Sequence, residues 1–284
     1  MSWQNIYKSK VTTADKAIRA IKSDNRVFLT GNCSIPKVLL NALVDYAPEI
    51  HDVEICHALT MGSNEYVAEG MEDHVRVNTM FIGANVRKAV QEGRADFTPV
   101  LLSEFTLLFK NDVLPLDVAF VHLSPPDEHG FCSYGIETGL TKSPAESADI
   151  IIAEINENMP RCLGDSFIHV SRLDYVVPVD YPLLELPMTE GGLSDVHIKI
   201  GQYIAELIPD GATMQMGIGA IPDAVLKFLQ DKRDLGVHTE LFSDSVIDLV
   251  ESGVLTNAQK TLHPGKITAG FMIGTHRLYE WAHD

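Results

Sequence analysis

The stretch T-M-Q-M-G-I-G-A-I-P-D-A-V-L-K-F-L, residues 213–229, repeats a pattern that occurs earlier as V-F-L-T-G-N-C-S-I-P-K-V-L-L-N-A-L, residues 27–43. Each copy predicts a strand, a glycine turn, a proline at the first helical position and an amphipathic helix. The identities that align the copies are Gly31 with Gly217, Ile35 with Ile221, Pro36 with Pro222, Leu40 with Leu226 and Leu43 with Leu229. The strand that follows each helix also corresponds, and we expect Glu240 to fall opposite Cys56. The repeat therefore predicts two homologous α/β domains.

The rest of the chain agrees with this fold class, because short apolar runs alternate with longer amphipathic stretches. Such alternation is typical of open α/β domains with largely parallel sheets. The runs predict strands at 26–30, 53–57, 77–82, 117–123 and 150–155 and helices at 36–43, 85–93 and 193–209. Gly93 is the expected residue after the C-cap of the second helix, and Ser194 is the expected N-cap of the third.

A proline-rich segment, V-P-V-D-Y-P-L-L-E-L-P at residues 177–187, suits neither a helix nor a central strand. We interpret it as the linker between a first domain at 1–187 and a second at 188–284. The second domain has about half the residues that the repeat leads us to expect. We therefore expect it to be truncated, with its C-terminal remainder absent.

Composition narrows the function classes. The 284 residues carry a net charge of −17, which argues against a nucleic-acid partner because phosphates demand a basic surface. No run of 18 apolar residues predicts a membrane span, and the start lacks the apolar core of a secretory signal, so we expect a cytoplasmic protein. The four cysteines lie far apart, which favours free thiols in a reducing compartment. A homodimer is the default expectation for such a protein.

The glycine turn M-G-I-G-A-I-P-D-A-V, residues 216–225, has two interpretations. Gly217 and Gly219 allow a ligand to approach the backbone, and the free N–H groups of the helix start attract a carboxylate, a phosphate or an oxyanion. The same turn could also serve packing alone. It matches neither a dinucleotide fingerprint, since Pro222 stands at the third glycine position, nor a P-loop.

The stretch G-V-H-T-E-L-F-S-D-S, residues 236–245, places Glu240 near the carboxyl end of a predicted strand. Neighbouring parallel strands end on the same side, so Glu240 and the glycine turn can converge there. A carboxylate that faces backbone donors suits covalent acyl chemistry. The alternative is a strand-end glutamate that caps the next helix or bonds to His238 or Ser243.

The stretch L-S-P-P-D-E-H-G-F-C-S-Y-G, residues 123–135, contains Asp127, Glu128 and His129 in succession. Three consecutive side chains rarely chelate one ion, and no second cluster lies at ligand spacing, so we predict no metal site. The prolines and Gly130 instead predict a rigid loop that shapes a pocket.

Five motifs in order resemble the acetyl-CoA hydrolase/transferase family, closest to the 4-hydroxybutyrate and butyrate:acetate CoA-transferases. They are residues 81–104, S-P-P-D-E-H-G-F-C-S-Y-G (124–135), residues 156–171, Q-M-G-I-G-A-I-P-D-A-V (215–225) and G-V-H-T-E-L-F-S-D (236–244). The resemblance implies that Glu240 attacks an acyl-CoA thioester and becomes a glutamyl-CoA thioester through a mixed anhydride. It implies that the turn with Gln215, Gly217, Gly219 and Ala220 lines the site, and that the loop from Pro125 to Gly130 borders the acyl pocket.

The implied activity is transfer of CoA between a short-chain acyl-CoA (acetyl, butyryl or 4-hydroxybutyryl) and a carboxylic acid. Coenzyme A is then a substrate, and no permanently bound cofactor is expected. An acyl-CoA hydrolase on the same scaffold and an inert binding module are the alternatives. A sugar-phosphate isomerase is supported by fold analogy alone, which does not establish a function. Family members are considerably longer than this chain and carry a further Gly-rich motif that it lacks.

Overall fold

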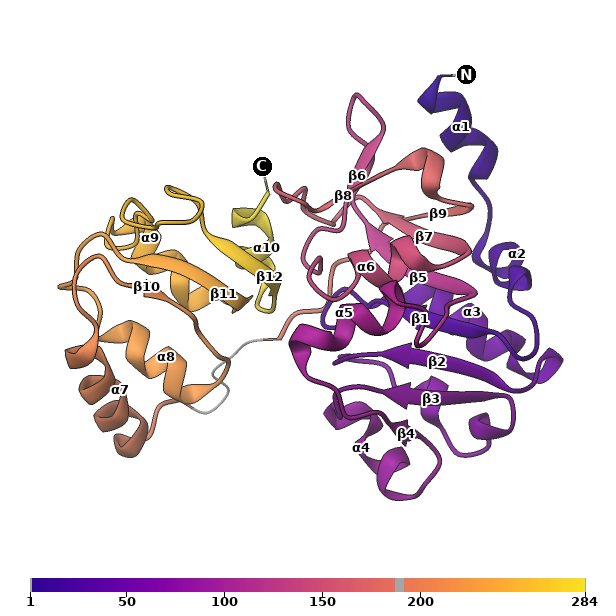
Figure 1. Cartoon of the computed structure of the whole chain (residues 1–284), viewed down its shortest axis with the longest axis horizontal. Helices are drawn as coiled ribbons and strands as arrows, with labels where there is room; N and C mark the ends of the chain where they lie inside the picture. Colours follow the sequence, from indigo (N-terminus) through magenta and orange to yellow (C-terminus); the bar gives the residue numbers. More distant parts are fainter. Residues whose placement is uncertain (1, 187–191, 284) are drawn as a thin grey trace. The chain divides into compact units, whose positions relative to one another are not determined.

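The computed structural model describes residues 2–186 and 192–283. The chain divides into two compact units, the first running to Leu184 and the second from Glu185 to Ala282 (Figure 1). The predicted domain boundary after residue 187 lies outside the described residues. Each unit is an α/β fold with a parallel main sheet, as the alternation of apolar runs predicted.

The first unit is built on a seven-stranded sheet in which every neighbouring pair is parallel. Its strands are β1 (Arg26–Leu29), β2 (Val53–His57), β3 (Val75–Thr79), β4 (Asp96–Phe97), β5 (Val118–Leu123), β7 (Ile150–Asn156) and β9 (Tyr175–Val179). The strand order is β4-β3-β2-β1-β5-β7-β9, so the direction of winding reverses between β1 and β5. In open α/β sheets, such a reversal opens a crevice at the carboxyl ends of the strands.

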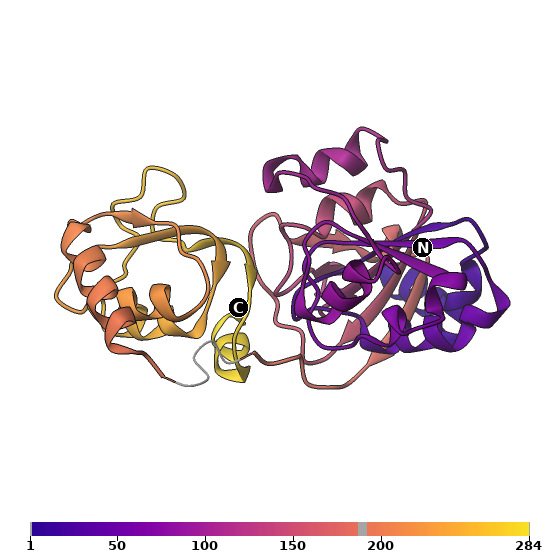
Figure 2. The ribbon, with the colours of Figure 1, turned by 90° about the horizontal axis from the view of Figure 1, so that it is seen from below.

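Helices cover both faces of this sheet, as the two views show (Figures 1 and 2). The helices of this unit are α1 (Trp3–Lys10), α2 (Ala14–Ala17), α3 (Lys37–Tyr46), α4 (Ala84–Gln91), α5 (Leu102–Lys110) and α6 (Lys142–Ser147). Val27 and Leu29 pack with α2, α3 and α4 on one face, whereas Phe28 packs with α5 on the other. This alternation follows from the two-residue period of a strand.

Two further strands, β6 (Phe131–Ser133) and β8 (Phe167–His169), form an antiparallel pair outside the main sheet. The pair is tied to α1, because the indole N–H of Trp3 donates to the carbonyl of Glu128 at 2.9 Å. The Lys10 ammonium also donates to backbone carbonyls just after β8, including that of Ser171 at 2.8 Å.

Two predicted boundaries in the first unit are wrong. Residues 177–179 of the predicted linker belong to β9, where Pro178 pairs with Ile155. A proline is tolerated there because β9 is the outermost of the seven strands, and the isolated bridge on its outer edge joins Val11 to Val176 rather than to Pro178. The strand predicted at 77–82 is β3 at 75–79, and the chain leaves the sheet after Met80, whose N–H donates to His57 at the end of β2.

Other predicted boundaries are confirmed. The bounds of β2 are those expected, and α4 ends with Glu92 as its C-cap followed by Gly93 at a φ of +75°. Gly93 is therefore the residue after the C-cap, in the left-handed region that glycine adopts at no steric cost.

The second unit has a three-stranded parallel sheet in the order β10-β11-β12. Its elements are α7 (Asp195–Leu207), β10 (Thr213–Met214), α8 (Ala220–Lys227), β11 (Gly236–Phe242), α9 (Ile247–Glu251), β12 (Thr268–Met272) and α10 (His276–Trp281). The succession β10, α8, β11 matches β1, α3, β2 in the first unit. The internal repeat is thus a repeat of structure as well as of sequence.

Two details of the predicted repeat are corrected. Pro36 is the N-cap of α3 and Pro222 is the third residue of α8, so neither stands at the first helical position. Both are tolerated, because the first N–H groups of a helix have no partner within it. The ladders pair Phe28 with Cys56 and the matching Met214 with Val237, so the residue of the second copy that is equivalent to Cys56 is Val237 and not Glu240.

The start of α7 confirms the predicted N-cap. The N–H of His197 donates to the Ser194 hydroxyl, and the His197 ring in turn accepts from the Ser194 N–H, so that the two residues form a capping box. Of the helices in the described ranges, none combines the length and the apolar character needed to cross a membrane.

Candidate active site

Glu240 lies in β11, the central strand of the second unit's sheet. The strand alternates, with Val237, Thr239 and Leu241 buried while His238 and Glu240 are exposed. Among the described residues, neither His238 nor Ser243 hydrogen-bonds the Glu240 carboxylate. The alternative in which Glu240 bonds to His238 or Ser243 is therefore wrong. The carboxylate is accessible to a ligand.

The glycine turn is fastened to the strand that carries Glu240. The Met216 N–H donates to the Thr239 hydroxyl at 3.0 Å, and that hydroxyl donates to the Met216 carbonyl, also at 3.0 Å. Thr239 directly precedes Glu240 in β11. The pair of hydrogen bonds thus holds the turn beside the strand at the residue that precedes Glu240.

Gly217 and Gly219 have little to do with packing. A Cβ on Gly217 would have its nearest neighbour 3.8 Å away, at Pro222, and one on Gly219 would meet nothing within 4 Å. At the matching position of the first unit, a Cβ on Gly31 would lie 2.3 Å from the Leu59 carbonyl oxygen. Packing therefore requires glycine in the first copy but leaves the second copy open, which favours the ligand interpretation of this turn. Gly219 has a φ of +111°, a conformation that side chains rarely adopt.

The start of α8 also faces solvent. In the described part of the chain, no acceptor binds the N–H groups of Ala220 and Ile221, the first two residues of the helix. Such orphan donors, with the positive end of the helix dipole behind them, form a suitable environment for an anion. The exposed Gln215 side chain donates to the Met216 carbonyl at 3.1 Å, which folds it over the turn.

A polar cluster beside this turn has no counterpart in the sequence-based predictions. Asp223 of α8 accepts a hydrogen bond from the Ser245 hydroxyl at 2.9 Å, and Asp244 accepts from the N–H and hydroxyl of Thr275 at 2.9 and 2.6 Å. These bonds join the first turn of α8 to the segments that follow β11 and β12. Burial raises the pKa of Asp223, and the nearby Asp244 adds to this effect. The S-D-S sequence after β11 could have indicated this cluster, but the residues that Asp244 and Ser245 bond to are distant in the chain and could not be identified from the sequence.

The loop from Pro125 to Gly130 belongs to the first unit and is internally braced. Asp127 accepts the N–H groups of His129 and Phe131 at 2.9 Å each and forms an ion pair with Arg161 at 3.2 Å. Gly130 has a φ of +89°, and a Cβ there would crowd Trp3 and the ring of His169. These contacts are those expected of a rigid loop, and its rigidity stays a prediction. The role in an acyl pocket stays a prediction.

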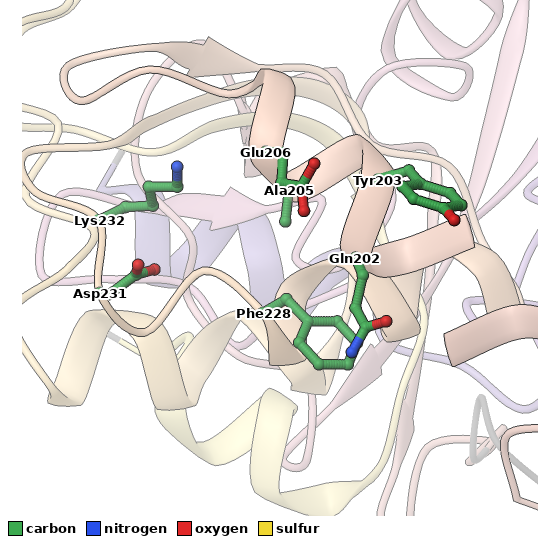
Figure 3. A pocket seen from close by; sticks show the side chains of 7 residues that line it. All are labelled: Gln202, Tyr203, Ala205, Glu206, Phe228, Asp231 and Lys232. Atoms are coloured by element: carbon green, nitrogen blue, oxygen red, sulfur yellow. The ribbon is translucent and has the colours of Figure 1, made fainter. Parts of the chain in front are cut away.

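Two cavities lie away from these residues. One of about 460 Å³ in the first unit is lined by residues that include Ile35, Lys37, Met61, His122, Tyr181 and Leu183. The other, of about 390 Å³, lies between the carboxyl ends of α7 and α8, where Gln202, Glu206, Phe228 and Lys232 line it (Figure 3). The second cavity is next to the chain that enters β11, at the opposite end of that strand from Glu240.

Known proteins resemble this chain over its whole length. Residues 1–183 match the family described as the acetyl-CoA hydrolase/transferase N-terminal domain. A 4-hydroxybutyrate coenzyme A transferase of Clostridium kluyveri is 50% identical over 284 residues, which are 100% of this chain and 66% of that protein. A butyryl-CoA:acetate CoA-transferase of Anaerostipes caccae is 33% identical over 100% of this chain and 65% of its own length.

The fold is shared with a solved structure. The crystal structure of a 4-hydroxybutyrate CoA-transferase from Porphyromonas gingivalis has a TM-score of 0.88 at 33% identity, covering 100% of this chain and 67% of that one. The chain spans just under two thirds of the length of the curated relatives described above. On the match of its first 183 residues and on these relatives, the chain belongs to the acetyl-CoA hydrolase/transferase family.

Proposed function

We propose that this chain carries the nucleophile of a CoA-transferase that moves coenzyme A between a short-chain acyl-CoA and a carboxylic acid. The observation that carries the proposal is the position of Glu240 on the strand to which the glycine turn is hydrogen-bonded. Its side chain is exposed, and neither His238 nor Ser243 forms a hydrogen bond with it among the described residues. The relatives named for 4-hydroxybutyrate and for butyryl-CoA and acetate support short acyl groups as substrates.

In the proposed first half-reaction, a Glu240 oxygen attacks the thioester carbonyl. The C–S bond breaks, which yields a mixed anhydride and the CoA thiolate. The thiolate then attacks the glutamyl carbonyl and expels the first acid as its carboxylate, leaving a glutamyl-CoA thioester. Nucleophiles and leaving groups are all anions, so no proton needs to be moved.

The second half-reaction reverses these steps with another carboxylate. Each attack puts negative charge on a carbonyl oxygen, and backbone N–H groups already in place stabilise such an oxyanion. The N–H groups at the turn from Gly217 to Ala220 are the proposed donors. Because a carboxylate is a weak nucleophile, much of the rate must come from positioning by the bound CoA portion of the substrate.

A hydrolase is the second candidate, and the family includes both activities in its name. In that case water, not a second acid, would attack the glutamyl-CoA thioester. The two candidates differ in whether turnover of the acyl-CoA requires an added carboxylic acid: a transferase requires the acid, whereas a hydrolase releases free CoA without it. The homodimer and the cytoplasmic location remain predictions.

The test is reductive trapping. The chain is incubated with butyryl-CoA and then borohydride, and the peptide that contains Glu240 is analysed by mass spectrometry. We expect reduction of the Glu240 thioester to an alcohol. The alcohol should be absent from Glu240→Gln. It should be retained in Glu206→Gln, a matched change at an exposed glutamate on α7.

A second arm uses a chain extended to the length of the relatives. Labelling in the extended chain alone would mean that residues beyond these 284 complete the site. If Glu240 stays unreduced in both chains, or if Glu240→Gln is labelled equally, the proposal is wrong.

A further inference from the structure

The two copies of the repeat differ in how the glycine turn is joined to the neighbouring strand. Cys56 and Val237 are equivalent, so two positions further along the chain Ala58 is equivalent to Thr239. The second copy thus has a hydroxyl group where the first has only a methyl group, one residue before Glu240. The side chain of Thr239 is buried, so its hydroxyl must bond to the protein rather than to solvent.

In the first copy, the turn closes onto the strand through its backbone. The Asn32 N–H donates to the Leu59 carbonyl at 2.7 Å, and the Asn32 carbonyl accepts the N–H of Met61 at 3.2 Å. These bonds form a parallel bridge between Asn32 and Thr60, which continues the register of β1 and β2. A Cβ on Gly31 would collide with the Leu59 carbonyl oxygen. The first turn therefore leaves no room for a ligand between Gly31 and the strand.

In the second copy, a side chain takes the place of this backbone bridge. The equivalent bridge would join Ile218 to Leu241, but in the described part of the chain no backbone hydrogen bond joins residues 217–219 to residues 240–242. Instead, the Thr239 hydroxyl accepts the N–H of Met216 and donates to its carbonyl, each at 3.0 Å. A side-chain hydroxyl between two backbones keeps them farther apart than direct backbone bonds would.

The second turn accordingly stands clear of the strand. A Cβ built on Gly217 would have only Pro222 within 4 Å, so no atom of β11 lies that close to it. Extending the register of β10 and β11 by three residues places Gly217 beside Glu240. The N–H groups of residues 217–219 have no acceptor among the described residues. Open space and free donors thus occur together at the position of Glu240.

We propose that Thr239 is a positioning residue, whose hydroxyl holds the glycine turn away from β11 and keeps this space and these donors available to a reacting carbonyl. Both hydrogen bonds of the hydroxyl go to Met216, so Thr239 acts through the turn and not on the substrate. This role rests on the proposed function of Glu240, because positioning has meaning only for a reaction at that residue.

The test compares three substitutions on the buried face of β11. Thr239→Val replaces the hydroxyl with a methyl group of similar size, and Thr239→Ser keeps the hydroxyl. Val237→Ala is the matched control, because it removes fully buried packing from the same face and leaves the bonds to Met216 in place. Thr239→Ala, which reproduces the residue of the first copy, serves as a second variant without the hydroxyl should Thr239→Val fail to fold.

The first measurement is the rate at which Glu240 becomes reducible by borohydride in the presence of butyryl-CoA. It uses this chain, or the extended chain if only that one is labelled. At saturating butyryl-CoA the rate should fall on the order of 10- to 100-fold in Thr239→Val, because small displacements of reacting groups cost that much. The butyryl-CoA concentration that gives half of the maximal rate should stay unchanged. Thr239→Ser and Val237→Ala should keep the wild-type rate.

The second measurement needs no reaction. Amide hydrogen exchange, resolved by residue with nuclear magnetic resonance, reports the turn itself. The Met216 N–H loses its acceptor in Thr239→Val, and we expect its exchange to become about tenfold faster, which corresponds to one hydrogen bond. It should keep the wild-type exchange rate in Thr239→Ser and in Val237→Ala. Unchanged Met216 exchange in Thr239→Val would overturn the proposal, whatever the trapping shows.

The outcomes separate the positioning role from the proposed function. Equal trapping in wild type and Thr239→Val would overturn the role of Thr239 and leave the function of Glu240 standing. Equal losses in Thr239→Val and in either Thr239→Ser or Val237→Ala would also overturn it, since packing alone would then explain them. If wild type and its extension are not trapped at all, the proposed function is wrong, and the positioning role is wrong with it.

Discussion

At the scale of single residues, Gly31 and Gly217 occupy the same position of the repeat in different surroundings. The first is pressed against the Leu59 carbonyl, and the second faces open space. One glycine is therefore required by the fold, whereas the other is free to serve a ligand. Identical residues at matching positions of a repeat can therefore have different roles, and each role has to be tested separately.

Alanine at these two positions provides that test. Gly31→Ala should lower the free energy of unfolding by about 1–3 kcal/mol, because the methyl group cannot be accommodated. Gly217→Ala should change it by no more than about 0.5 kcal/mol but should reduce borohydride trapping at Glu240, since the methyl group would obstruct the approach to the turn. Urea unfolding measures the first effect, and peptide mass spectrometry the second.

The pair would contradict our assignment if Gly217→Ala proved as destabilising as Gly31→Ala. It would also do so if trapping in a folded Gly217→Ala chain were undiminished.

Glu154, a buried residue of β7, should make stability depend on pH. Burial raises its pKa in the folded chain to about 7 from a usual value of 4.5, so the folded state holds its proton more tightly than the unfolded state. The resulting contribution is fully present below about pH 4.5 and is lost as the pH rises toward 7. Relative to Glu154→Gln, wild type should therefore lose on the order of 2–3 kcal/mol over this range.

Urea unfolding of both proteins at intervals from pH 4.5 to 8 measures this difference. Burial lowers the pKa of His57 and of His122 to about 4, and both histidines are present in the two proteins, so their contribution cancels to first order. A difference that stays constant with pH would show that Glu154 titrates in the folded chain as it does in the unfolded one.

At the scale of elements, two helix caps were predicted correctly, whereas the helices expected at 36–43 and 193–209 run from 37 to 46 and from 195 to 207. Ser194 and Gly93 act through local backbone geometry, so a few consecutive residues suffice to identify them. The positions of Pro36 and Pro222 were predicted less well. The first turn of a helix accepts proline at several places, and local sequence does not choose among them.

The cap of α7 can be tested by Ser194→Ala. Loss of the hydroxyl that accepts the His197 N–H should cost about 1 kcal/mol of stability, because one helix donor is left without its partner. Ser103→Ala is the matched control, at an exposed serine in the first turn of α5. Urea midpoints would contradict the assignment if the two substitutions had the same effect.

At the scale of the whole molecule, the chain consists of two units with separate sheets. Both large hydrophobic clusters of the first unit are made of residues between Trp3 and Val179, on the two faces of one sheet. Nothing in these clusters requires a side chain from the second unit. The first unit has the internal packing of an independent domain.

We therefore expect residues 1–184 to fold alone, with a single cooperative thermal transition and a circular dichroism spectrum of an α/β protein. Phe120→Ala, at a fully buried position of β5, is the control and should lower the midpoint, since such truncations cost about 3–5 kcal/mol. Absence of a cooperative transition in the unsubstituted fragment would mean that its stability requires the second unit.

The sequence by itself determined the fold class, the internal repeat, the bounds of β2, the cap of α7 and the family. Periodicity and capping act over a few residues, and the motifs are contiguous. The tertiary structure alone decided that Pro178 lies in an edge strand and that Val237 is the repeat equivalent of Cys56. It also decided that Asp223 bonds to Ser245 and that Glu154 bonds to Leu39 across 115 positions of the chain. Each depends on how separate elements pack, because residues far apart in the sequence become neighbours only when the sheet and its helices are assembled.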